Sequence, residues 1–116
     1  MNSSVKKVTY KDQMDRKAKK AKKRQKNTAD ALAAFRRALT AQGEGSNETI
    51  SALEVYVEKC CETSVYLLDM GHYDDSGKAL ADCLKVLKRD IKARYPAQLY
   101  KVYYRQAQLM NAKELH

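Results

Sequence analysis

The sequence predicts an all-α fold of about five helices, and three features indicate this class. The 116 residues include one proline and four glycines, so few positions interrupt a helix. Alanine, leucine, lysine, glutamate and glutamine are frequent, and they lose little side-chain freedom in a helix. Apolar residues recur at spacings of three and four, which is the period of one helix face. This length fits one compact domain.

The first two predicted helices form a pair. Residues 10–26 carry a narrow stripe that is expected to pack on residues 28–39, and its members are Tyr10, Met14, Ala18, Ala21 and Gln25. The stretch NTADALAAFRRALTAQ follows, with Asn27 or Thr28 as the expected cap of the second helix. The apolar face of the second helix consists of Ala31, Leu32, Phe35, Ala38 and Leu39.

The third helix follows GEGSN, the clearest break in the chain. It is expected from about residue 48 to residue 70, and Gly71 is predicted to end it as a left-handed C-terminal cap. The residues predicted to point inward are Ile50, Leu53, Val57, Cys60, Cys61, Ser64 and Leu67.

The fourth and fifth helices are separated by the only proline. Asp74 or Asp75 is expected to cap the fourth helix. Its inward positions are Ala79, Leu80, Cys83, Leu84, Leu87 and Ile91. A residue that precedes proline avoids the helical conformation, whereas proline itself suits the first turn. The fifth helix is therefore predicted to begin at Pro96 and to run to the end of the chain.

The three cysteines indicate a reducing compartment. Their number is odd, and the neighbours Cys60 and Cys61 cannot readily form a disulfide. We predict that Cys83 and at least one of that pair are buried, inert thiols. His72 and His116 do not supply a zinc-ligand pattern, so we predict no metal and no cofactor.

No apolar run reaches the roughly 20 residues that a membrane span needs, and the polar N-terminus lacks the apolar core of a signal peptide. We expect a location in the cytoplasm, the nucleus or both. The carboxylates of Asp74, Asp75 and Asp82 and the thiol of Cys60 have no activating base at a suitable spacing. We therefore predict no catalytic residue in this chain.

Charge is concentrated near the N-terminus. Residues 1–43 carry 13 Lys and Arg against 3 acids, a net +10, whereas residues 44–116 carry 10 against 11, a net −1. The basic segment, residues 1–27, is either a solvated helix face or a site for nucleic acid, a nuclear import receptor or an anionic membrane. The nucleic-acid alternative rests on residues 6–26, and its candidate contacts are Lys19, Lys20, Lys22, Lys23 and Arg24.

An internal repeat follows from two aligned stretches, ADALAAFRRAL and SGKALADCLKV. Small, bulky and small positions coincide at Ala31, Phe35 and Ala38 in the first, and at Ser76, Leu80 and Cys83 in the second. Upstream, SVYLLDMGHYDD provides a close contact, a bulky contact, a tight turn and an aromatic plug at Ser64, Leu67, Gly71 and Tyr73. This pattern resembles the tetratricopeptide repeat, in which helix pairs stack as a right-handed superhelix. Residues 28–116 are its expected extent, truncated at the C-terminus.

A longer run, GHYDDSGKALADCLKVLKRDIKARYPAQLYKVYYRQAQ, is similar to the N-terminal repeats of SET-and-MYND-domain lysine methyltransferases. The resemblance implies that this chain is the N-terminal part of such a protein. A longer parent would then be a lysine methyltransferase. Nothing in these residues matches the zinc module or the SET domain.

The repeat resemblance implies an interaction scaffold that binds a peptide or a helix in a concave groove. In chaperone-binding members, basic residues and two asparagines hold the carboxylates of an acidic tail. Lys101, Arg105 and Arg16 match the basic positions, whereas Lys20 and Glu62 stand where the asparagines would be. The predicted peptide site therefore consists of Arg16, Glu62, Lys101, Tyr104 and Arg105. Two alternatives stay open: Lys101 and Arg105 as a solvated face, and the tyrosines as base-stacking groups.

Overall fold

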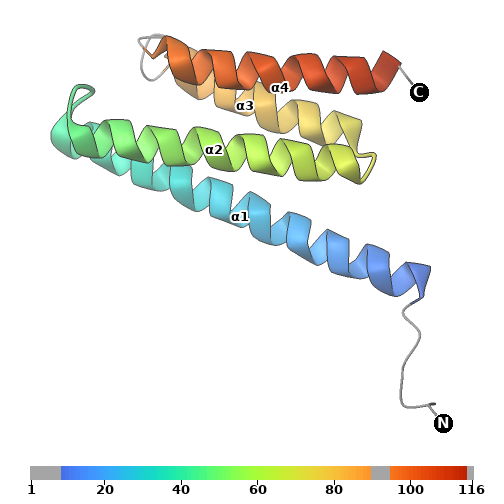
Figure 1. The fold of residues 1–116 in the computed structure, drawn as a ribbon. Helices are drawn as coiled ribbons and strands as arrows, with labels where there is room; N and C mark the ends of the chain where they lie inside the picture. The colour runs from blue at the N-terminus through green and yellow to red at the C-terminus, as the bar shows by residue number, and fades with distance from the viewer. Residues whose placement is uncertain (1–8, 90–94, 115–116) are drawn as a thin grey trace.

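The structure, a computed structural model, describes residues 9–89 and 95–114. Within these ranges the chain forms four helices and no strand, which confirms the all-α class. The helices are α1 (Tyr10–Gln42), α2 (Asn47–Asp69), α3 (Tyr73–Arg89) and α4 (Pro96–Glu114). Helix α2 contacts each of the other three, and α3 also contacts α4 (Figure 1). The molecule is elongated, with principal extents of 62 × 34 × 16 Å.

The expected break at residues 27–28 does not occur, so the first two predicted helices are one helix, α1. Thr28 does not act as an N-cap. Its hydroxyl instead donates to the Arg24 carbonyl one turn earlier, at 2.9 Å, and lies 3.1 Å from the Thr63 hydroxyl of α2. The cap of α1 is Thr9, whose hydroxyl accepts the Asp12 N–H at 3.1 Å while the Asp12 carboxylate accepts the Thr9 N–H at 3.3 Å. The chain therefore has four described helices where five were expected.

Because α1 is continuous, the expected packing of residues 10–26 on residues 28–39 is also wrong. The N-terminal half of α1 instead adjoins the C-terminal half of α2, where the Tyr66 hydroxyl donates to the Lys17 carbonyl at 3.2 Å. Ala21 is buried, whereas Tyr10 is 78% exposed. The first turns of α1 therefore extend past the end of α2, as Figure 1 shows at the blue end of the helix.

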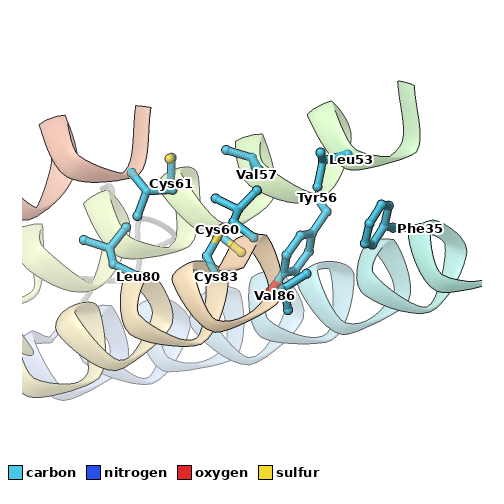
Figure 2. Packing of buried hydrophobic residues seen from close by; sticks show 11 residues of the cluster. Phe35, Leu53, Tyr56, Val57, Cys60, Cys61, Leu80, Cys83 and Val86 are labelled. Carbon is cyan, nitrogen blue, oxygen red and sulfur yellow. The ribbon is translucent and has the colours of Figure 1, made fainter. Parts of the chain in front are cut away.

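The hydrophobic core surrounds α2 (Figure 2). It consists of Phe35 from α1, Leu53, Tyr56, Val57, Cys60 and Cys61 from α2, Leu80, Cys83, Val86 and Leu87 from α3, and Val102 from α4. Most of the inward positions predicted for the third and fourth helices are buried, although Ile50, Ala79 and Leu84 are half-buried and Ile91 lies outside the described residues. The pattern missed Tyr56 and Val86, which are 2% and 5% exposed.

The turn between α2 and α3 has the predicted glycine cap. Gly71 adopts φ +79°, a left-handed conformation that favours glycine. Its N–H donates to the Leu68 carbonyl and the His72 N–H donates to the Leu67 carbonyl, both at 2.9 Å. These two bonds form a Schellman motif and satisfy carbonyls that the end of α2 leaves without helical partners.

The predicted cap of helix α3 is wrong: α3 begins at Tyr73, before both Asp74 and Asp75, which lie in its first turn. At this position the positive end of the helix dipole stabilises their negative charges. Ser76 joins α3 to α2: its buried hydroxyl lies 2.7 Å from the Ser64 hydroxyl and donates to the Ser64 carbonyl at 2.8 Å. Helix α4 begins at Pro96, as predicted.

None of the described helices is both long and apolar enough to cross a membrane.

We expect Gly71→Ala to lower the free energy of unfolding by about 1 kcal/mol, because a side chain is disfavoured at a left-handed φ. Gly45→Ala is the matched control, since Gly45 has no positive φ and no atom within 4 Å of an added Cβ. Urea unfolding followed by circular dichroism measures both. Equal shifts of the two midpoints would contradict the assigned cap.

Candidate binding groove

A groove of about 520 Å³ lies between α1, α2 and α4. Helix α2 forms its floor, and one residue each from α1 and α4 forms its walls. The lining residues are Arg24 of α1, Glu58, Cys61, Glu62, Val65, Tyr66 and Asp69 of α2, and Arg105 of α4. The groove therefore combines two arginines with three carboxylates.

The three carboxylates line one face of α2. Glu58 and Glu62 are four residues apart, and Asp69 follows seven residues later. Such spacings place side chains in one row along a helix. The floor of the groove is therefore an acidic row beside the rings and methyl groups of Tyr66 and Val65.

The α1 wall is Arg24, which contacts the floor in two ways. Its guanidinium lies 4.8 Å from the ring centroid of Tyr66, and its Nη1 lies 3.9 Å from Glu62 Oε2. Lys59 Nζ also approaches that oxygen, at 3.7 Å. Both ion pairs are partly exposed and contribute little to stability. They offset the charge of Glu62, which reduces the repulsion that this carboxylate would exert on an acidic ligand.

The α4 wall is Arg105, and neighbouring side chains orient its guanidinium. Its Nη1 donates to Gln108 Oε1 at 2.8 Å, and its Cζ lies 5.5 Å from the ring centroid of Tyr104. The Gln108 amide in turn lies 3.4 Å from the Tyr104 hydroxyl. Lys101 is exposed one turn earlier on α4. The two walls therefore each present an arginine that lies against a tyrosine ring.

The structure brings together only part of the predicted peptide site. Glu62 and Arg105 line the groove, and Tyr104 lies against Arg105. Lys101 is exposed and does not line the groove. Arg16 is also exposed, eight residues before Arg24 on α1, which is about 12 Å along the axis.

Sequence reasoning placed Arg24 with the basic segment and missed its place in the groove. The reason is the helix break expected at residue 27. In a continuous helix, Ala21, Arg24 and Thr28 share one side, because they are three and four residues apart. That side carries the buried Ala21 and the Thr28 hydroxyl that contacts α2. The other nucleic-acid candidates, Lys19, Lys20, Lys22 and Lys23, are all exposed on α1.

The three cysteines are buried, as predicted, between 0% and 8% exposed. Cys60 and Cys83 point toward each other from α2 and α3 (Figure 2). Their mutual hydrogen bond, and then burial, raise the pKa of Cys83. Burial also raises the pKa of Cys61, and the charges of Arg105 and Lys101 oppose this only in part. In the described part of the chain, no cluster of three or more His, Cys, Asp or Glu is placed to hold a metal ion.

A second cavity of about 430 Å³ opens on another side of α2, between α1 and α3. Its lining includes Tyr56, Cys60 and Thr63 from α2 and Asp75, Lys78 and Asp82 from α3. It has no arginine, and none of the predicted peptide-site residues line it.

No family model, no curated protein and no solved structure matches this chain. The resemblance to tetratricopeptide repeats, and to the N-terminal repeats of SET-and-MYND-domain methyltransferases, therefore stays a prediction.

We expect the free energy of unfolding to fall as the pH rises above about 9, in part because of Cys61. Its pKa is raised in the folded chain, whereas the unfolded chain releases the proton at the ordinary value of 9.0. Above that pH the unfolded state binds fewer protons, so the contribution of this thiol is complete below pH 9 and is lost as the pH rises. The slope is at most about 1.4 kcal/mol per pH unit for one thiol.

Urea unfolding between pH 7.5 and 10 measures this slope. Cys61→Ala should make it shallower, whereas Val65→Ala, which removes a neighbouring groove side chain without a titratable group, should leave it unchanged. A slope that is identical in wild type and Cys61→Ala would show that the thiol does not contribute.

Proposed function

We propose that this chain is a protein-interaction scaffold that binds a peptide or a helix in the groove between α1, α2 and α4. One observation carries the proposal: the two helices that flank the groove each present an arginine lying against a tyrosine, Arg24 with Tyr66 and Arg105 with Tyr104. The proposal assigns binding, and no catalysis, to these residues.

Carboxylates are the ligand groups that such walls suit best. A guanidinium that already lies against an aromatic ring loses less freedom when it binds an anion. It also presents paired N–H donors that match the two oxygens of a carboxylate. The acidic row of Glu58, Glu62 and Asp69 below the walls favours basic or amide groups of the ligand instead. The expected partner is therefore a peptide with acidic side chains at its edges, and an acidic chaperone tail is one candidate.

The outer surface of α4 supplies apolar area beside this groove. Tyr100, Tyr104 and Met110 are 71%, 61% and 62% exposed, and Tyr103 is 42% exposed. Exposed apolar side chains gathered on one element often mark an interaction surface. Tyr104 contacts Arg105, so a ligand that reaches the arginine also meets this surface.

The tetratricopeptide arrangement belongs to the same proposal. Helix α2 contacts both α3, with which it forms a hairpin, and α4, which would open the next pair. This connectivity is what a stack of helix pairs needs. A longer parent protein with lysine methyltransferase activity is part of this hypothesis.

The proposal is tested with a fluorescein-labelled 12-residue peptide that contains four glutamates and three leucines, titrated with the full chain. We expect Arg24→Gln with Arg105→Gln to weaken binding at least tenfold, because one charged hydrogen bond contributes roughly 1.5 to 3 kcal/mol. Arg37→Gln with Arg89→Gln is the matched control, since it removes the same charge from exposed positions outside the groove. Fluorescence anisotropy measures both.

Equal losses in the two double variants would show that the groove is not the binding site. Two further arms define the contacts. Lys101→Gln measures whether the exposed lysine beside Arg105 takes part. An amidated version of the peptide that bound tenfold more weakly would show that the groove holds a terminal carboxylate, whereas equal binding of both peptides would assign the contacts to the glutamate side chains.

A further inference from the structure

The net charge of the chain lies entirely in its first 26 residues. Residues 1–8 carry two lysines, a net +2, and residues 9–26 carry nine Lys and Arg against two Asp, a net +7. Residues 27–116 carry 12 Lys and Arg against 12 Asp and Glu, a net of zero, which accounts for the total of +9. The part of the chain that forms most of the core is therefore neutral, and +7 of the net +9 lies on residues 9–26, at the N-terminal half of α1.

Seven of these cations form a surface that we name the basic ridge. All seven are exposed on one helix, and they are Arg16, Lys17, Lys19, Lys20, Lys22, Lys23 and Lys26. At 100° per residue they cover on the order of 220° of the circumference of α1. None of the seven has a carboxylate partner within 4.0 Å among the described residues. Arg24 is not included, because it contacts Glu62 and Tyr66 in the groove.

Repulsion between the ridge cations destabilises the N-terminal half of α1 when no ligand is bound. Lys19 is three residues from Lys22 and four from Lys23, and Lys22 is four residues from Lys26. Like charges at these spacings face each other on a helix and destabilise it. This stretch is nevertheless helical. Thr9 caps the N-terminus of α1 before it, and the Tyr66 hydroxyl of α2 donates to the Lys17 carbonyl within it. A dense array of negative charge would relieve the repulsion and match the ridge.

We propose that the basic ridge binds the phosphate backbone of double-stranded nucleic acid without reading the base sequence. A duplex carries one negative charge per roughly 1.7 Å of its axis. The ridge runs over residues 16–26, about 15 Å of helix, so several of its cations can reach phosphates at once. It consists of lysine and arginine alone and has no aromatic ring to stack on a base.

A lipid surface fits the ridge less well than a duplex. A helix that lies on a membrane inserts a broad apolar face of large side chains. The side of α1 opposite the ridge instead carries Met14, which is half-buried, and the small residues Ala18 and Ala21, the second of which is buried. Tyr10 is the one large exposed apolar side chain on the described part of this half of α1.

The experiment measures binding of the full chain to a fluorescein-labelled 24-base-pair DNA duplex of mixed sequence, from 50 to 250 mM NaCl. Contacts to five to seven phosphates predict that log K falls against log salt with a slope of about −4.5 to −6.3. A duplex with a shuffled sequence should bind within threefold of the first.

The test variant changes Lys20, Lys22 and Lys23 to Gln, which keeps helix propensity and lowers the net charge from +9 to +6. We expect at least tenfold weaker binding at 100 mM NaCl and a slope that is shallower by about 2.7, which is 0.9 for each lost contact. The matched control changes Lys78, Lys85 and Lys88 of α3 to Gln, with the same net charge, and should bind within twofold of wild type. Circular dichroism confirms that both variants keep their helix content.

Three outcomes would overturn the proposal. Equal losses of duplex affinity in the two triple variants would show that binding depends only on the net charge of the chain. A shuffled duplex that bound more than tenfold differently would show base readout. Vesicles with 30% phosphatidylserine that bound the chain when the duplex did not would assign the ridge to a membrane. None of these outcomes tests the proposed peptide site, because Arg24 and Arg105 are unchanged in both triple variants.

Discussion

Burial of α2 on several sides is the constraint on which the rest of the structure depends. Leu53 and Val57 are at most 1% exposed, and seven further residues of the same helix are buried around them. Helices α1, α3 and α4 each cover a different part of this surface. Three helices packed on α2 leave parts of its surface uncovered. The groove and the second cavity lie at these uncovered parts. The candidate site is therefore a direct result of how α2 is buried.

The side of α1 that contacts α2 separates the two proposed binding surfaces. Helix α1 has 33 residues and α2 has 23. At 1.5 Å per residue, α1 is longer by about 15 Å, so its N-terminal turns extend past the bundle. Most of the ridge lies where α2 is alongside, because the Tyr66 hydroxyl of α2 already reaches the Lys17 carbonyl, yet all seven ridge side chains are exposed. Arg24 lies within the same stretch, but its side chain contacts Tyr66 and Glu62 of α2 and forms a wall of the groove.

Several local features were readable from the sequence because they depend on the backbone of a few residues. Gly71 ends α2 since a left-handed turn favours glycine, and Pro96 begins α4 since proline lacks an N–H that a first turn does not need. The predicted helix cap at Thr28 was wrong. Threonine caps a helix or bonds back within one, and the Thr63 hydroxyl of α2 lies close enough to favour the second arrangement.

The sequence by itself determined the helical class, the burial of the cysteines and the location of the excess charge, because composition and helical period carry this information. Only the tertiary structure decided which charged residues meet. Arg24, Glu62 and Arg105 lie about 40 residues apart along the chain, and no local pattern links them. They share one groove because α1 and α4 pack on neighbouring sides of α2. That placement depends on how side chains far apart in the sequence, such as Phe35 and Val102, fit together in the core. The helical period of a single sequence does not specify this fit.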